Sequence, residues 1–230
     1  RLSLVGSEMC IRDRLQQLAI VDSVKWIWKG NLRVPAEEKG EDRFVPEDEP
    51  LCNEYGYAHK QIKMLNGTKL HEAGFQGEGM RVAVIDAGFM NADRISAFDS
   101  LRLLGTHNVV FPGKSVFVGD DHGTKVLACL AADIPGVMVG TAPKASYLLL
   151  KSEDSDSEYP VEEDYWTAAV EYADSAGVDV ISSSLGYFAF DADELSYDQS
   201  ALDGKTTLIS QAAHMAAVSY THLTLPTILR

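Results

Sequence analysis

Three short apolar runs, each followed along the chain by a segment with helical periodicity, constrain the fold more than any other feature. The runs are RVAVI (residues 81–85), ASYLLL (145–150) and VDVI (178–181). Continuous apolar runs of this length are typical of strands buried on both faces of a parallel sheet. The segments 123–132, 161–176 and 206–217 carry apolar residues at the spacing of an amphipathic helix. This alternation predicts an α/β fold, with a parallel sheet and helices on both of its faces.

The sequence also predicts which side of each helix faces the sheet. In the helix at 161–176, which should end at Gly177, the inward residues are Trp166, Ala169, Val170 and Ala173. In the helix at 123–132 they are Val126, Leu127, Leu130 and Ala131, and Cys129 is expected there as a small core residue. In the helix at 206–217 they are Leu208, Ile209, Ala212, Ala213 and Ala216. A further helix is expected from residue 59 to a stop at Gly74, after a polar linker or exposed loop at 35–56.

Both ends of the chain differ in character from the part between them. Residues 1–14 show neither a helical nor a strand period. Residues 218–230 become Thr-rich and alternating without the Gly, Asn or Pro that normally separates a helix from a strand. Both segments resemble translated sequencing-adaptor read-through, so we predict that they are foreign to the protein and exclude them from the fold prediction.

The charge balance and the cysteines limit the classes of partner. The 20 basic and 34 acidic residues leave a net charge of −14, which argues against a nucleic-acid partner. No apolar run approaches the roughly 20 residues of a membrane span, so no transmembrane segment is expected. The three cysteines, at positions 10, 52 and 129, have no CxxC spacing and support neither a zinc site nor a disulfide framework.

Two titratable residues are expected to meet at one edge of the predicted sheet. Asp86 follows the apolar run RVAVI directly, at the carboxyl end where open parallel sheets place their sites. His122 stands at the start of the helix at 123–132, where Gly123 allows a close backbone approach and Thr124 offers a hydroxyl. A carboxylate that fixes one ring nitrogen leaves the other nitrogen to act as a base. We therefore expect Asp86 and His122 to form a catalytic pair.

A third segment follows the last predicted strand at the same edge of the sheet. Ser184, Leu185 and Gly186 read either as a polar turn with a glycine stop or as an exposed extended segment. In the second interpretation their main chain pairs with a peptide by strand addition.

Four blocks of sequence together resemble one known family. The blocks VAVIDAGF (82–89), DDHGTKV (120–126), GTAPKASYLLLK (140–151) and DVISSSLGY (179–187) are similar, in their order, to the signature blocks of the subtilisin-like serine proteases, the subtilases of peptidase family S8. The acidic, Tyr-rich composition resembles that of secreted bacterial members of the family. The resemblance covers about residues 56–217. Ala87, in place of the hydroxyl residue usual after the Asp, and Lys125 with Leu127 depart from the family pattern.

The resemblance implies roles for these residues and an organisation for the chain. Asp86 would orient the histidine, His122 would be the general base, and Ser184, Leu185 and Gly186 would line the cleft for a polypeptide substrate. Residues 15–55 would be the end of an inhibitory pro-segment with a linker, and residues 56–217 the N-terminal part of the catalytic domain. The family's nucleophilic serine and oxyanion asparagine belong after residue 217, so the chain as given is expected to be an inactive fragment.

The resemblance also carries expectations about cofactors and location. The chemistry would require no cofactor, and structural calcium, which occurs in the family, is left without assigned ligands. The run EDSDSEYPVEED (153–164) lacks the spacing of an EF-hand loop and is expected to be a solvated acidic loop. The protein would be a secreted or cell-envelope zymogen with its own pro-segment as intramolecular inhibitor.

Three alternatives are weighed against the protease. A metal-dependent hydrolase could use Asp86, Asp120, Asp121 and His122 as ligands, although side chains adjacent in sequence rarely converge on one ion. A non-catalytic peptide-binding protein could share the fold, and the sequence downstream of residue 217 would decide this. A dinucleotide-binding domain is disfavoured because the glycines of GFQGEGM (74–80) precede the strand instead of following it.

Overall fold

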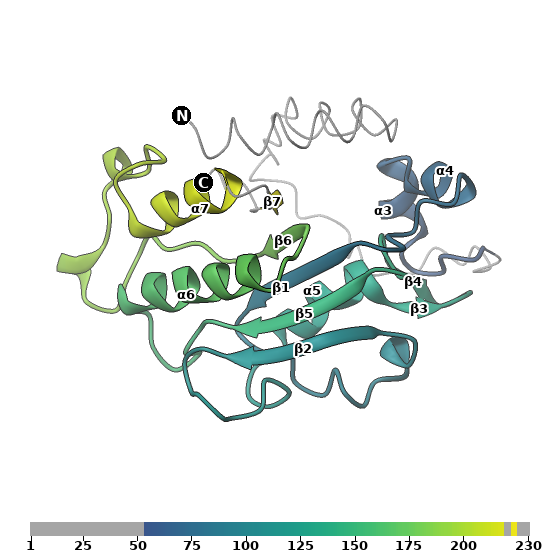
Figure 1. Ribbon diagram of the computed structural model, residues 1–230, viewed down its shortest axis with the longest axis horizontal. Coiled ribbons are helices and arrows are strands. Elements are labelled where there is room, and N and C mark those ends of the chain that lie inside the picture. The colour runs from purple at the N-terminus through teal and green to yellow at the C-terminus, as the bar shows by residue number, and fades with distance from the viewer. Residues whose placement is uncertain (1–52, 219–221, 225–230) are drawn as a thin grey trace, which may run out of the picture.

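A computed structural model describes residues 53–218 and 222–224 of the chain (Figure 1). The N-terminal segment predicted to be foreign (1–14), nearly all of the predicted pro-segment and linker (15–55), and most of the predicted foreign tail (218–230) lie outside the described residues. The predicted organisation of these segments therefore stays a prediction.

A parallel sheet of five strands forms the centre of the fold, in the order β2-β5-β1-β6-β7. The three predicted strands are confirmed as β1 (Arg81–Asp86), β5 (Ser146–Lys151) and β6 (Val180–Ser183), with β1 between the other two. The pairing of Asp86 with Lys151 and of Ile85 with Ser183 brings the carboxyl ends of these strands to one edge.

The sheet has two strands that the apolar pattern did not predict. β2 (Arg102–Asn108) lies at one edge, is mostly exposed, and has a register irregularity between Leu103 and Gly105. It therefore lacks the continuous apolar run of a strand buried on both faces. At the other edge the backbone of β7 (His222–Thr224) pairs with β6. This pairing falls within the tail predicted to be foreign and does not test where that tail comes from.

Alternate residues of the central strands supply two separate cores. Ala83 and Ile85 of β1, with Leu148 and Leu150 of β5, pack against α6 (Val161–Ser175) and α7 (Leu208–Val218). Val82 and Val84, with Tyr147 and Leu149, pack against α5 (His122–Ala131). Figure 1 shows α6 and α7 together on one side of the sheet and α5 on the other. The predicted α/β architecture with helices on both faces is thus confirmed.

The predicted inner faces of the helices hold with two exceptions. All four expected residues of α6 are buried, and the chain leaves this helix at Gly177 with a φ of 69°. In α7 the three expected alanines are buried, but Leu208, at the first position of the helix, is 37% exposed. Cys129 was expected in the core and is exposed. The buried face of α5 contains Leu127, and Cys129 lies two positions further, about 200° around a helix of 3.6 residues per turn.

The remaining elements lie mostly around the start of the described chain and between the main strands. The single helix expected from residue 59 to Gly74 is divided into α3 (His59–Met64) and α4 (Gly67–Glu72), because Asn66 adopts a left-handed φ of 56°. A short antiparallel pair consists of β3 (Asp133–Ile134) and β4 (Met138–Val139). Three single-turn 3-10 helices are η1 (Ser96–Phe98), η2 (Asp193–Leu195) and η3 (Gln199–Ala201). Among the helices of the described chain, none combines the length and apolarity required to cross a membrane.

Trp166 should contribute more to the stability of this core than any exposed residue of the same helix. It is fully buried, and its indole N–H donates to the hydroxyl of Ser183 at 2.9 Å. We expect Trp166→Ala to lower the free energy of unfolding of the 230-residue chain by about 3–5 kcal/mol in urea denaturation. The control Glu171→Ala changes an exposed residue of α6 and should stay within about 0.5 kcal/mol of the wild type. Equal losses in the two variants would contradict this assignment of the core.

Candidate functional site

Asp86 ends β1 as a completely buried carboxylate, with 0% of its surface exposed. Its Oδ1 accepts hydrogen bonds from the backbone N–H of Ala87 at 2.8 Å and from Nδ1 of His122 at 2.7 Å. Its Oδ2 is buried and has no hydrogen-bond partner among the described residues. Burial raises the pKa of Asp86, while the hydrogen bonds from His122 and Ala87 oppose that rise.

His122 is the first residue of α5, and the structure places its ring against Asp86 as expected. An ionised carboxylate can only accept a hydrogen bond, so Nδ1 carries the proton in this contact. The other ring nitrogen, Nε2, is then free of a proton in the neutral ring and able to accept one. Half of the His122 side chain (51%) is exposed, so an external group can reach it.

The approach of α5 to β1 requires a glycine directly after the histidine. A Cβ at Gly123 would lie 2.5 Å from the carbonyl oxygen of Gly88 and 2.8 Å from Cβ of Asp86. Both contacts are closer than real Cβ atoms tolerate. Gly123 therefore allows the start of α5 to lie directly on the turn that follows Asp86.

Hydrogen bonds fix the loops on either side of this contact. The hydroxyl of Thr124, which the sequence offered as a polar group at the helix start, donates to the carbonyl oxygen of Met90 at 2.9 Å. The N–H of Met90 donates to the carbonyl oxygen of Asp120 at 2.9 Å. The carboxylate of Asp120 accepts from the backbone N–H of His122 at 2.7 Å. Thr124 and Asp120 thus hold the histidine in place through the backbone.

Lys151 is a buried residue of the site that the sequence analysis did not single out. It pairs in register with Asp86, is 6% exposed, and its Nζ donates to the carbonyl oxygen of Ala87. Burial lowers the pKa of Lys151, against the attraction of the acidic residues around it. The signal that could have revealed Lys151 is its place at the end of SYLLLK, which matches the place of Asp86 at the end of RVAVID.

A cleft of about 620 Å³ joins His122 to the segment after β6. Ser184, Leu185 and Gly186 line this cleft, as do Ala87 and Asp120. The structure therefore brings together the two parts of the site that the sequence placed at one sheet edge, the Asp86–His122 pair and the segment 184–186.

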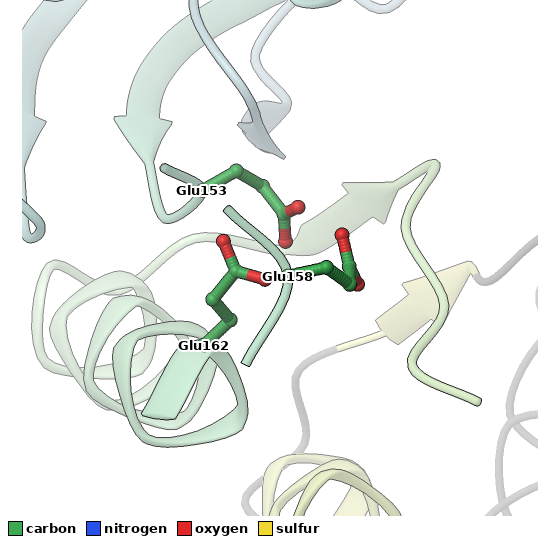
Figure 2. A group of neighbouring side chains, drawn as sticks. All are labelled: Glu153, Glu158 and Glu162. Atoms are coloured by element: carbon green, nitrogen blue, oxygen red, sulfur yellow. The ribbon is translucent and has the colours of Figure 1, made fainter. Parts of the chain in front are cut away.

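A group of carboxylates lies at the wall of the same cleft, which two of them, Glu153 and Glu158, line. Glu153, two residues after the end of β5, Glu158 in the following loop and Glu162 in α6 each place a carboxylate oxygen within 4.8 Å of the others (Figure 2). Burial raises the pKa of Glu153 to about 8 and that of Glu162 to about 7. The stretch 153–164 was expected to be a solvated loop, but Glu162 and Glu163 are each only 1% exposed. Both precede Trp166 and Val170 on the inner face of α6, a helical spacing that could have revealed their burial.

The ligand set of the alternative metal hydrolase does not assemble. Asp120 accepts from the backbone of His122, and Asp121 pairs with Nζ of Lys125 at 2.8 Å. Within the described residues, the three ligand atoms that come within 4.8 Å of one another belong to Glu153, Glu158 and Glu162, and not to this set.

Comparison with known proteins places this chain beside one group of enzymes. It is 32% identical over 150 residues to "Subtilisin E" of Bacillus subtilis (strain 168), a match that covers 62% of this chain and 36% of that protein. It is 28% identical over 126 residues to "Thermostable alkaline protease" of Halalkalibacterium halodurans, covering 54% of this chain and 33% of that protein. The chain thus matches only about a third of the length of these curated relatives. No family model matches the sequence.

Among solved structures, the fold is similar to that of MycP1 with its N-terminal propeptide removed. The TM-score is 0.52 at 20% sequence identity, and the match covers 74% of this chain and 49% of that one. This likeness concerns the fold alone.

The first prediction from the site concerns Gly123. We expect Gly123→Ala to lower the free energy of unfolding by about 1–3 kcal/mol, because backbone and Asp86 must move to admit the Cβ. Gly105→Ala is the matched control, since its Cβ would meet Leu148 at an ordinary 3.7 Å. The control should be neutral or more stable by up to about 1 kcal/mol in urea denaturation. A tolerated Gly123→Ala would argue against the close approach.

The second prediction concerns the tautomer of His122. In the neutral ring, ¹⁵N chemical shifts should show a protonated Nδ1 and an unprotonated Nε2. Asp86→Asn should lower the fraction of this tautomer, because an amide can also donate a hydrogen bond. Asp121→Asn removes the same charge next to His122 without contacting the ring and should leave the shifts unchanged. Identical ring shifts in all three proteins would show that Asp86 does not select the tautomer.

Proposed function

The described part of this chain is subtilisin-like in sequence and in fold, and from that premise we propose that the whole protein is a serine endopeptidase. The family predicted from the four sequence blocks is thereby confirmed. One observation carries the proposed activity: Nδ1 of His122 lies 2.7 Å from the buried carboxylate of Asp86, at the rim of a cleft.

In the proposed mechanism His122 moves the proton and Asp86 holds the ring. Nε2 of His122 accepts the hydroxyl proton of a serine outside this sequence as that oxygen bonds to the carbonyl carbon of the substrate. The same nitrogen then gives the proton to the leaving amine as the peptide bond breaks. Asp86 accepts from Nδ1 throughout and stabilises the positive charge that the ring carries between the two transfers.

The substrate proposed for the cleft is an extended polypeptide. Ser184, Leu185 and Gly186 line the cleft that His122 borders, which supports pairing of their main chain with a peptide. Inhibition by a pro-segment within residues 15–55, and a secreted or cell-envelope location, belong to the same proposal. The proposed chemistry requires no cofactor.

The test uses the protein encoded by the natural gene, including whatever follows residue 217. A fluorophosphonate probe should label one serine of that protein, and the protein should hydrolyse casein. We expect Asp86→Asn to reduce kcat by about 10⁴-fold and His122→Ala by about 10⁶-fold. The carboxylate of Asp121 pairs with the exposed Lys125, so the control Asp121→Asn should keep wild-type kinetics.

Two results would contradict the proposal. Peptide binding without labelling or hydrolysis would indicate a non-catalytic binding protein on this fold. Casein hydrolysis by the 230-residue chain itself would show that a nucleophile other than the proposed serine does the work, because base and orienter alone leave little acyl-transfer catalysis.

A further inference from the structure

We propose that Glu153, Glu158 and Glu162 form a binding site for a hard divalent cation, of which calcium fits best, behind the part of the cleft wall that Glu153 and Glu158 line. One carboxylate oxygen from each residue lies within 4.8 Å of the others. Figure 2 shows the three side chains reaching a common space from the end of β5, from the loop and from α6. A single ion about 2.4 Å from each oxygen can contact all three at such separations.

The burial of Glu162 separates this group from an ordinary acidic surface. Glu162 is 1% exposed, and its Oε1 accepts from the backbone N–H of Asp154 at 2.9 Å. Its Oε2 is buried and has no hydrogen-bond partner among the described residues. Buried carboxylate oxygens are costly without a partner, so this oxygen points to a missing ligand.

The neighbouring residue shows how this fold satisfies a buried carboxylate when no ligand is involved. Glu163 is equally buried at 1% exposed. Its Oε1 accepts from the hydroxyl of Tyr197 at 2.5 Å, and its Oε2 accepts from the backbone N–H of Ile209 at 2.9 Å. Glu163 is therefore complete within the protein, whereas Glu162 is not.

In the described part of the chain no lysine or arginine forms an ion pair with the three glutamates, and the charge of Lys151 acts on Glu153 without direct contact. Within the described residues, no lysine or arginine nitrogen lies within 4 Å of their carboxylates. The hydroxyl of Tyr187 donates to Glu153, which satisfies an oxygen but brings no charge. When ionised, three clustered carboxylates with no paired cation repel one another, and a divalent cation removes that repulsion.

The donor set and the burial select the kind of ligand. Carboxylate oxygens favour hard cations, and calcium accepts irregular oxygen geometry more readily than magnesium does. A basic side chain of a bound peptide is a poorer fit, because Glu162 is closed off from solvent and Glu153 is only 9% exposed.

Such an ion would tie two segments that shape the cleft to the neighbouring helix α6. Glu153 and Glu158 line the cleft together with Ser184, Leu185 and Gly186. An ion held between the end of β5, the loop and α6 would fix the cleft wall that lies near the proposed peptide-binding segment 184–186. The site stands independently of the proposed catalysis, because none of its residues contacts Asp86 or His122 by a hydrogen bond in the described chain.

The test is calorimetric titration of calcium chloride into the EDTA-stripped 230-residue chain, which requires no enzymatic activity. We expect Glu162→Gln to weaken calcium binding at this site by at least about 10-fold. Asp164→Asn removes an exposed carboxylate from the same first turn of α6 and should keep the wild-type affinity. If Glu162→Gln does not fold, Glu158→Gln in the loop replaces it with the same expected loss.

The proposal is overturned by either of two outcomes. One is a wild-type chain that binds no calcium up to about 10 mM, beyond the range of weak extracellular calcium modules. The other is a calcium affinity that stays unchanged in the folded Glu162→Gln or Glu158→Gln variant. Neither outcome bears on the proposed peptidase, whose test depends on a serine and on Asp86 and His122.

Discussion

The contact between the start of α5 and the end of β1 is the constraint on which the site depends. Gly123 leaves room for the carbonyl oxygen of Gly88, and this brings the imidazole of His122 onto the carboxylate of Asp86. The backbone around the contact is hydrogen-bonded through Thr124 and Asp120, so the ring is held from both sides. Two residues 36 positions apart in the chain are thus hydrogen-bonded to each other in the substrate-free protein.

The parts of the fold that could be predicted are those in which burial produces a recognisable pattern of apolar residues in the sequence. β1 and β5 are buried on both faces and read as apolar runs, and β6 continues the apolar run 178–181 although only alternate residues of it are fully buried. α6 shows its inner face through Trp166 and the residues at helical spacing from it. β2 could not be predicted in this way, because an edge strand with an exposed face needs no apolar run. The break between α3 and α4 depends on one left-handed residue, Asn66, which a hydrophobic pattern does not register.

In the candidate site, too, some residues could be predicted from the sequence and others could not. Asp86 and His122 were predictable because polar residues directly after a buried strand or at a helix start stand out against their surroundings, and the sheet brings those positions together. The glutamates were misread because an acidic run looks like a solvated surface, and only the packing of α6 shows that Glu162 and Glu163 face inward. The carboxylate of Glu163 is hydrogen-bonded by Tyr197 and Ile209, whereas Oε2 of Glu162 has no hydrogen-bond partner among the described residues. This difference depends on contacts with segments distant in the sequence.

The hydrogen bond from Trp166 to Ser183 has a consequence for the run of three serines at the end of β6. Because side chains alternate along a strand, the inward direction of Ser183 turns Ser182, the other serine within β6, the opposite way. Three identical serines cannot by themselves distinguish the observed register of β6 against β1 from a register shifted by one residue. The packing of Ile181 and Trp166 in the core must therefore fix the alignment of β6 in the sheet. The core on one face of the sheet thus determines which serine hydroxyl lies on the other face.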